Sequence, residues 1–517
     1  MATGDMELFA RCASGFEDVL AGELRELGAH RVRPQVGGVS WYGRLADAYR
    51  ICLWSRVSTR VQLVLGRVGC QTADELYGGV ADIAWEDHVR GGATIAVKAH
   101  GTNENLRNTA FSALKAKDAI CDRLRASRGS RPDVDSHNPD LAIDLAIHER
   151  KATVYLNLSG PSLHRRGYRE EGVQTEAPLK ETLAAGMLLA AGWPALAREG
   201  GVLVDPMCGS GTLAIEGALI AGNVAPGIWR EHWGFEGWAQ HDAGLWAHVL
   251  ADARERVVTG GAARILAGDI DEGALSVARD NVRRAQVSSL VQLYRDDANR
   301  LGRHLRGALK RGARQGLLAT NPPYGKRLGT TDDLVRVNEA LATSVEALPE
   351  GWLVAIITPD VTIDSALGRV PERVIDCHNG PLEVALRIYE KSAANRRVCE
   401  VVSLTGVRRE VPVSDVHSEQ FAGRFRKVAR DADRGDGGVC PERDKLPRPP
   451  CPRVYEADLP DYPYAIDISA SDVTITELRR PRKSQAQQAA RKLADARAIV
   501  AAVLDVPQAD VHMYTSY

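Results

Sequence analysis

A strand, a glycine turn and an apolar helix follow one another over residues 201–221. Residues 201–205 (Gly-Val-Leu-Val-Asp) form the continuous apolar run that is typical of a strand buried in a parallel sheet, and residues 213–221 have the composition of a buried helix. Between them, Gly209-Ser210-Gly211 predicts a tight turn where the backbone can approach a ligand closely. This unit constrains the chain to an α/β fold with Asp205 at the carboxyl end of a strand.

Two nucleotide-binding alternatives compete for this turn. The spacing matches the loose G-x-G-x-x-A fingerprint of nicotinamide-binding folds, but these expect an acidic strand end about 20 residues later. The next acidic strand end, Asp269, comes more than 50 residues beyond Gly211. A phosphate-binding P-loop is excluded because no Gly-Lys-Ser/Thr follows the turn. Asp205 precedes the glycines, where its carboxylate can attract an ammonium or sulfonium cation.

Strand and helix patterns alternate along the following 180 or so residues. The predicted elements are strands at 264–267, 291–294, 316–320 and 352–358, helices at 271–286 and 332–348, and an antiparallel closing strand at 382–389. This order predicts a doubly wound sheet with its ligand sites at the carboxyl ends of the strands. Asp205, Asp269, Asp297 and Asn321 all fall at such ends.

The tetrapeptide Asn321-Pro322-Pro323-Tyr324 ends one of these strands. Two successive prolines have fixed φ angles and no N–H, so their carbonyls and the Asn321 amide oxygen form a rigid set of acceptors. Such a set can hold an exocyclic –NH2 group, and Tyr324 offers a flat surface on which a base can stack. The pattern therefore favours N-methylation of a nucleobase, with a simple strand-terminating turn as the alternative.

Together these motifs resemble the class I S-adenosylmethionine-dependent methyltransferases, and among them the THUMP-containing family that methylates guanine N2 in RNA. Within that family the chain resembles the bacterial 23S ribosomal RNA methyltransferases of the K/L type. The resemblance is carried by residues 205–212, 268–269, 297–298 and 321–325, by the segment 164–185 that leads into the cofactor domain, and by the K/L-like stretches 138–141, 233–242 and 379–383.

The resemblance implies S-adenosylmethionine as the cofactor and assigns a role to each motif. The implied cofactor-binding residues are Asp205, Cys208, Gly209, Gly211, Thr212, Asp269, Asp297 and Asn321, and the implied catalytic residues are Asn321, Pro322, Pro323 and Tyr324. Asp269 would bind the ribose hydroxyls and Asp297 the adenine amino group. Two alternatives remain open: Asp269 could cap the following helix instead, and Asp296 competes with Asp297. No metal is expected, because the sulfonium is already a good leaving group.

The same resemblance predicts five regions: a ferredoxin-like domain at 1–48, a THUMP RNA-binding domain at 49–160, the methyltransferase domain at 161–392, a linker at 393–453, and the start of a second methyltransferase half at 454–517.

Two basic helices are expected, at 107–128 and 484–504, each of which could contact RNA phosphates or be a solvated face. The first carries Arg107, Lys115, Lys117, Arg123, Arg125 and Arg128; the second region carries Arg479, Arg480, Arg482, Lys483, Arg491, Lys492 and Arg497. No second cofactor turn lies in 454–517, so N2-methylguanine and no 7-methylguanine is expected.

Bulk properties set limits on the partners. The net charge of −1 predicts that any RNA contact is a local basic face. Nine cysteines without C-x-x-C pairing indicate reduced thiols, and the absence of a leader or long apolar run predicts a cytoplasmic protein without a membrane segment. The expected function is methylation of a guanine N2 in 23S rRNA. The alternatives are a THUMP-type tRNA guanine-N2 methyltransferase, a DNA adenine-N6 methyltransferase and a non-enzymatic RNA-binding ribosome assembly factor. The THUMP resemblance disfavours the DNA methyltransferase, so no DNA partner is expected.

Overall fold

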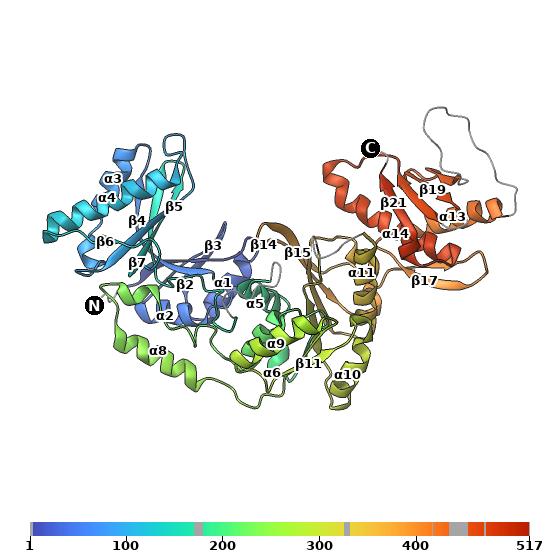
Figure 1. Cartoon of the computed structure of the whole chain (residues 1–517), viewed down its shortest axis with the longest axis horizontal. Helices are drawn as coiled ribbons and strands as arrows, with labels where there is room; N and C mark the ends of the chain where they lie inside the picture. Colours follow the sequence, from blue (N-terminus) through green and yellow to red (C-terminus); the bar gives the residue numbers. More distant parts are fainter. Residues whose placement is uncertain are drawn as a thin grey trace.

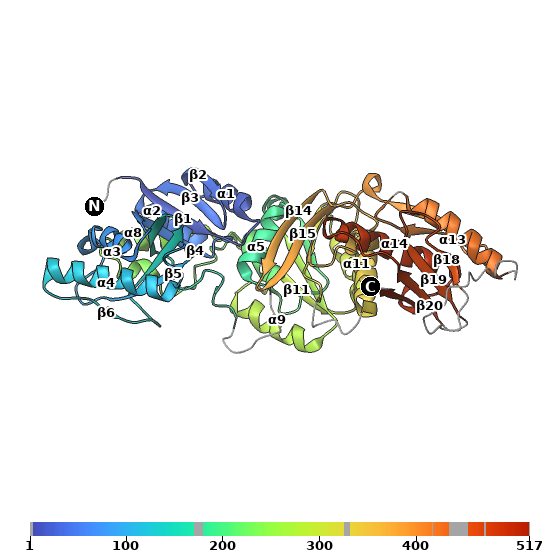
Figure 2. The same cartoon turned by 90° about the horizontal axis from the view of Figure 1, so that it is seen from above.

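The computed structural model describes residues 4–169, 179–324, 331–415, 417–433, 453–469 and 472–515. Gly325 of the Asn-Pro-Pro-Tyr motif, residues 170–178 of the segment leading into the cofactor domain, and Cys440 and Cys451 of the expected linker lie outside these ranges. The described parts form three regions along the long axis of the molecule, with the amino-terminal region at one end and the carboxyl-terminal region at the other (Figures 1 and 2).

Residues 4–169 are built around an eight-stranded sheet with the order β2-β3-β1-β4-β8-β7-β5-β6. Its strands are β1 (Met6–Arg11), β2 (His30–Gln35), β3 (Gly38–Gly43), β4 (Arg60–Gly69), β5 (Thr94–His100), β6 (Asp133–Val134), β7 (Leu141–His148) and β8 (Lys151–Asn157), and its helices are α1 (Glu17–Glu26), α2 (Leu45–Trp54), α3 (Ala73–Ala81) and α4 (Thr109–Arg128). β4 pairs with β1 on one side and with β8 on the other. The expected division at residue 48 therefore does not separate two sheets, since the ferredoxin-like and THUMP parts share one.

The basic helix α4 buries a face of mostly small residues and leaves two large apolar residues exposed. Its buried face is formed by Ser112, Ala116, Ala119, Ile120, Cys121 and Leu124, whereas Phe111 and Leu114 are 44% and 55% exposed. Several of its cations are held by the protein: Arg123 contacts Glu86 at 2.7 Å, and Lys115 and Arg125 lie 3.8 and 3.6 Å from Asp74 and Asp122. Phosphate contact by this helix stays a prediction.

Residues 179–390 contain the doubly wound sheet, with the order β11-β10-β9-β12-β13-β15-β14. The strands are β9 (Val202–Asp205), β10 (Arg264–Asp269), β11 (Val291–Arg295), β12 (Gly316–Thr320), β13 (Leu353–Thr358), β14 (Arg373–Asn379) and β15 (Leu382–Glu390). The helices are α5 (Glu181–Ala190), α6 (Trp193–Arg198), α7 (Thr212–Ala221), α8 (Ala243–Glu255), α9 (Glu272–Arg284), α10 (Leu301–Lys310), α11 (Thr331–Glu346) and α12 (Ile363–Leu367). The predicted strands and helices of this domain are present, and β15 is antiparallel to β13 as expected. The sequence patterns did not predict β14, α6, α8, α10 or α12.

Burial on both faces explains the continuous apolar run in β9. Leu203 joins the core that contains α5 and α7, while Val202 and Val204 join the separate core that contains α10 and α11. Both neighbours of β9, β10 and β12, run parallel to it. The order of the parallel strands reverses between β9 and β12, which is where ligands bind in sheets of this kind.

Charged side chains join the amino-terminal region to the cofactor domain. Arg56, which follows α2, donates from Nη2 to the carbonyl of Val224 at 2.9 Å, and its own carbonyl accepts from Arg166 at 2.6 Å. The Arg166 guanidinium lies 3.5 Å from Glu216 of α7, and both side chains are buried. The amino end of α7 carries the predicted cofactor turn, so this network links the amino-terminal sheet to the helix that follows the turn.

The expectation of a linker at 393–453 is wrong for residues 398–433. These residues form β16 (Val398–Val402), β17 (Arg408–Pro412) and α13 (Ser418–Asp433). They share one core with β18 (Arg453–Glu456), β19 (Tyr464–Ile468), β20 (Val473–Glu477), α14 (Ala486–Leu504) and β21 (Val511–Thr515). Phe421, Phe425 and Ala429 recur at helical spacing and are buried in this core, so apolar periodicity outweighs the polar composition of the segment. We call residues 398–515 the carboxyl-terminal module.

The expectation that α14 is a solvated or phosphate-binding basic helix is also wrong for three of its cations. Arg497 is 2% exposed and bonds Asp332 at 2.7 Å, Arg491 contacts Asp364 at 2.8 Å, and Lys492 contacts Asp461 at 3.1 Å. These cations pair within the protein because α14 packs between the rest of the module and the cofactor domain. Arg479, Arg480, Arg482 and Lys483 precede the helix and are exposed.

Candidate cofactor and substrate site

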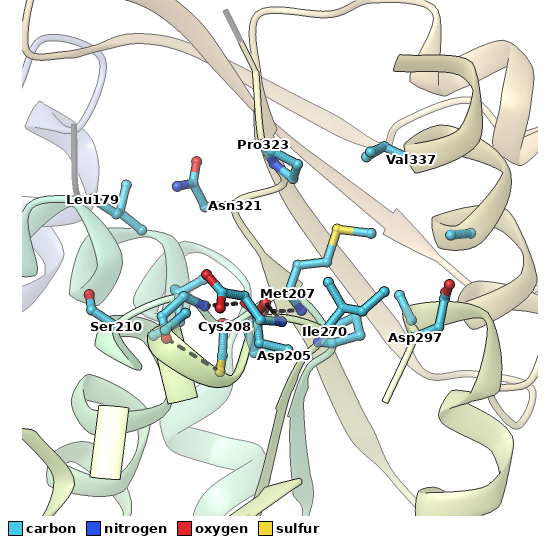
Figure 3. Close-up of a pocket in the computed structure, with 18 of the residues that line it drawn as sticks. Leu179, Asp205, Met207, Cys208, Ser210, Ile270, Asp297, Asn321, Pro323 and Val337 are labelled. Carbon is cyan, nitrogen blue, oxygen red and sulfur yellow. Dashed lines mark hydrogen bonds between the residues drawn. The ribbon is translucent and has the colours of Figure 1, made fainter. Parts of the chain in front are cut away.

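A cavity of about 500 Å³ lies at the carboxyl ends of β9, β10, β11 and β12. Of the residues predicted from the sequence, it is lined by Asp205, Cys208, Gly209, Thr212, Asp269, Asp297, Asn321 and Pro323. Figure 3 shows Asn321 and Pro323 on one side of the cavity and the loop with Asp205, Cys208 and Ser210 on the other. Gly211, Pro322 and Tyr324 belong to the same loops but do not line it.

The turn between β9 and α7 has the conformation that its glycines allow. Gly209 and Gly211 have φ angles of 52° and 82°, in the left-handed region. At Gly211 an added Cβ would lie 3.3 Å from the Cβ of Ala278, so the turn also packs closely against α9. Cys208 N–H donates to the Gly268 carbonyl at 2.8 Å, which attaches the turn to the end of β10.

Asp269 organises this turn and does not cap the next helix. Its Oδ2 accepts from the Gly209 N–H at 2.8 Å and its Oδ1 from the Asp271 N–H at 3.0 Å. The cap of α9 is Asp271, whose side chain accepts from the Gly273 N–H. The helix-cap alternative for Asp269 is therefore wrong. A carboxylate has about four acceptor positions, so each Asp269 oxygen retains one for a ligand hydroxyl.

Asp205 is the most deeply buried acid of the cavity. It is 1% exposed, and its Oδ1 accepts from the Thr320 hydroxyl at 2.8 Å and from the Met207 N–H at 3.2 Å. Burial raises the pKa of its carboxyl to about 7; the two hydrogen bonds offset part of this rise, and the neighbouring charge of Asp269 adds to it. Burial also raises the pKa of the Cys208 thiol, which is therefore protonated and unreactive. A cation in the cavity would favour the ionised form of Asp205.

The structure distinguishes Asp297 from Asp296. Asp297 lines the cavity and also caps the short helix η3 (Ala298–Arg300) by accepting from the Asn299 N–H at 3.0 Å. Asp296 does not line it, and its Oδ2 lies 3.0 Å from His304 Nε2. This hydrogen bond is the main reason that the pKa of Asp296 is lowered. Asp296 therefore bonds a residue of α10 and does not face the cavity. The geometry favours Asp297 as the residue that contacts a ligand.

Asn321 presents an acceptor without a partner. Its Oδ1 is buried and has no hydrogen bond within the described residues. Most buried polar atoms have a partner, so such an acceptor at a cavity wall indicates a donor on a ligand.

Tyr324 differs from its expected role: it is 8% exposed, and its hydroxyl accepts from Asn379 Nδ2 at 3.0 Å. Stacking of a base on Tyr324 stays a prediction.

Sequence reasoning missed much of the apolar lining. Met207, Ile270 and Ala298 come from strand ends, and Val337 and Ala340 come from α11. Ile270 had a detectable signal in the sequence, since it is an apolar residue between two acids at a strand end. The α11 residues had no local signal, because helix periodicity does not indicate which neighbour a partly buried face will meet.

The cavity fits S-adenosylmethionine on the evidence of its donor and acceptor set. Its volume is within the range for small-molecule sites, about 300–1,000 Å³. Free acceptor positions on Asp269 suit vicinal hydroxyls, Ile270 and Ala298 offer apolar surfaces for a flat ring, and Asp205 suits a cation. The parallel strand order, the glycine turn and this cavity define a class I S-adenosylmethionine-dependent methyltransferase.

Comparisons with known proteins narrow the class. Residues 166–388 match the family described as RMKL-like, methyltransferase domain; residues 7–62 match the RlmL ferredoxin-like domain and residues 70–157 the THUMP domain. The chain belongs to the family of the ribosomal RNA large subunit methyltransferases K/L. The member from Syntrophotalea carbinolica is 38% identical over 94% of this chain and 66% of its own length. The member from Methylococcus capsulatus is 36% identical over 98% of this chain and 68% of its own length.

Solved structures agree with this placement. A protein assigned as a methyltransferase and complexed with SAH is 29% identical, with a TM-score of 0.65 over 75% of this chain and 98% of that one. A possible methylase from Clostridium difficile 630 is also 29% identical, with a TM-score of 0.67 over 75% of this chain and 98% of that one.

The chain spans about two thirds of the length of the curated relatives. No helix in the described ranges combines the length and apolar character that crossing a bilayer requires.

Proposed function

We propose that this protein transfers a methyl group from S-adenosylmethionine to the exocyclic N2 of a guanine in 23S ribosomal RNA. The observation that carries the proposal is the buried Oδ1 of Asn321 at the end of β12, which has no hydrogen-bond partner in the described part of the chain. An exocyclic amino group offers the N–H donors that this atom lacks. The printed names of the relatives, which are large-subunit ribosomal RNA methyltransferases, and the match to the THUMP family support RNA as the substrate.

One side of the cavity would bind the cofactor and the other the target base. The methionine end of the cofactor would be held by Asp205, Cys208, Gly209 and Thr212, in a turn whose shape depends on Gly211. Asp269 would bind the ribose, and Asp297 would bind the adenine amino group. The bound cofactor supplies an electrophilic methyl group on a positively charged sulfur. Asn321 would accept one N–H of the target amino group, and the carbonyls of Pro322 and Pro323 would accept the other.

Hydrogen bonding to these acceptors would direct the nitrogen lone pair of the amino group toward the methyl group. Removal of water and fixed orientation then account for the rate, so no acid or base with a matched pKa is required. Transfer moves the positive charge from sulfur to the nitrogen, which is then strongly acidic and releases its N2 proton to solvent. A guanine in a helix must leave its stack to reach the cavity, with Tyr324 as the predicted stacking partner.

The test is a methylation assay with three purified substrates: protein-free 23S rRNA, bulk tRNA and duplex DNA. Digestion to nucleosides and mass spectrometry should detect N2-methylguanine in 23S rRNA and little methylation of the others. Methylation of tRNA alone would support the THUMP-type tRNA alternative, and N6-methyladenine in DNA would overturn the RNA assignment. Absence of any product despite cofactor binding would favour a non-enzymatic assembly factor. A parallel analysis of rRNA from cells lacking the protein identifies the nucleotide.

A further inference from the structure

Helix α11 lies between the sheet of the cofactor domain and the carboxyl-terminal module (Figures 1 and 2). Arg336, Val337 and Ala340 on one side of the helix line the cofactor cavity. Leu334 and Val335 on the other side line a second cavity, of about 370 Å³, which α14 also lines. The position of α11 therefore affects both the shape of the cofactor site and the contact with the module.

The amino end of α11 is joined to α14 by an ion pair in which the arginine is buried and the aspartate is partly exposed. Arg497 of α14 donates from Nη2 to Oδ1 of Asp332, in the first turn of α11, at 2.7 Å. The Arg497 side chain is 2% exposed and its Nε donates to the Gln508 carbonyl at 2.8 Å, so the guanidinium is held in one orientation. α11 begins at Thr331, seven residues after Tyr324 of the proposed substrate motif.

Further along, α11 is held by the cofactor domain itself. The Ser344 hydroxyl donates to the carbonyl of Ala298, the residue after Asp297, at 2.7 Å. Asn338 donates to Asp360 at 2.8 Å, beyond the end of β13. The middle and carboxyl end of the helix are thus fixed from within the domain, while Arg497 reaches its first turn from outside it.

Apolar packing does not by itself define the distance between α11 and α14. The 370 Å³ cavity lies between the two helices, so part of their facing surface is not in contact. A buried guanidinium is strongly disfavoured without a partner, which makes arrangements that separate Arg497 from Asp332 unfavourable. The ion pair is then the contact that selects one position of the first turn.

We propose that Arg497 is a positioning residue for the methyltransferase site: through Asp332 it fixes the first turn of α11, and with it the wall of the cofactor cavity formed by Arg336, Val337 and Ala340. The effect of Arg497 on catalysis rests on the proposed function. The effect of Arg497 on cofactor binding does not depend on the RNA substrate. The carboxyl-terminal module is accordingly part of the machinery that shapes this site.

A second ion pair across the same interface provides a matched control. Arg491, also on α14, contacts Asp364 of α12 at 2.8 Å. No residue of α12 lines the cofactor cavity, and Asp364 keeps Arg387 at 2.7 Å and the Tyr389 hydroxyl at 2.6 Å when Arg491 is removed. Arg491→Gln therefore weakens the docking of the module without releasing the cavity wall.

The experiment compares Arg497→Gln, Asp332→Asn and Arg491→Gln in the full chain, with S-adenosylmethionine binding measured by calorimetry and folding by thermal unfolding. Arg497→Gln and Asp332→Asn should each raise the dissociation constant by about fivefold to twentyfold, and Arg491→Gln by less than about twofold. The Asp332→Arg/Arg497→Asp double variant should recover most of the affinity. Asp332 is 34% exposed, so Asp332→Asn remains informative if Arg497→Gln does not fold.

Equal losses from Arg497→Gln and Arg491→Gln would overturn the proposal, because docking of the module alone would then explain both. Unchanged affinity in Arg497→Gln and Asp332→Asn would overturn it as well. These outcomes are independent of whether wild-type protein methylates 23S rRNA, so a failure of the proposed function is recognised separately by the nucleoside assay.

Discussion

The two sides of the cofactor cavity differ in how their polar atoms are satisfied. On the side formed by β9, β10 and β11, the carboxylates of Asp205, Asp269 and Asp297 already accept hydrogen bonds from the protein. On the side formed by β12, the Oδ1 of Asn321 has no partner among the described residues. The first side is organised before a ligand arrives, whereas the second becomes complete only with a donor on the substrate. Substitutions should therefore affect binding on one side and turnover on the other.

The largest effect is expected from Asn321→Ala. Loss of an acceptor used mainly in the transition state should lower kcat by about 10²–10³ while cofactor affinity stays within about twofold. Single-turnover methylation of 23S rRNA and calorimetry with S-adenosylmethionine measure the two quantities. Near-normal turnover would show that the acceptor set does not act on the amino group, and an equal loss of cofactor affinity would remove the distinction between the two sides.

Asp269→Ala should weaken cofactor binding by roughly 1–3 kcal/mol, because charged hydrogen bonds to the ribose and the bond to the Gly209 N–H are both lost. Calorimetry should give one S-adenosylmethionine per wild-type chain. At saturating cofactor, kcat of the variant should remain close to the wild-type value, unlike that of Asn321→Ala. Preferential binding of NADH by the wild-type protein would contradict the assignment of the whole site.

The pH dependence of cofactor binding should report Asp205. Its pKa of about 7 in the unliganded protein means that the carboxyl is largely protonated below pH 7. A bound cation favours the ionised form, so affinity should be highest above pH 7 and fall by up to about tenfold per unit below it. The unliganded fold should conversely lose stability as pH rises from about 4 to about 7, because over this range the carboxyl is ionised in the unfolded chain and still protonated in the folded protein.

Asp205→Asn is the control for this effect, because it keeps the size of the side chain and removes its titration. Calorimetry between pH 5.5 and 8.5 should give a flatter profile for the variant, with weaker binding than wild type at the upper end. A wild-type profile that is flat over about three pH units, or that falls toward high pH, would exclude ionised Asp205 as the cation partner.

The smallest effect separates the adjacent acids Asp297 and Asp296. Asp297→Ala should weaken binding by about 0.5–1.5 kcal/mol, the value of one hydrogen bond to the adenine amino group. Asp296→Ala should leave the dissociation constant nearly unchanged, since Asp296 lies outside the cavity and bonds His304. The reverse ranking in calorimetry would assign the adenine contact to Asp296.

The positions of the site residues followed from the sequence to a large extent. The apolar run before Asp205, the two glycines and the Asn-Pro-Pro motif each define a strand end, and carboxyl ends of parallel strands meet at one edge of the sheet. Eight of the predicted residues accordingly line one cavity. The sheet itself was predictable for the same reason, because strands buried on both faces are apolar throughout and alternate with helices.

Other features were decided by contacts between segments that are far apart in the chain. The choice between Asp296 and Asp297 depends on His304, and the burial of Tyr324 depends on Asn379. Both α4 and α14 carry basic residues, yet Arg123 of α4 pairs near the surface of its own domain, while Arg497 of α14 is buried against α11. The partner of a charged side chain is the group that tertiary packing places next to it. The neighbouring residues in the sequence therefore do not identify that partner.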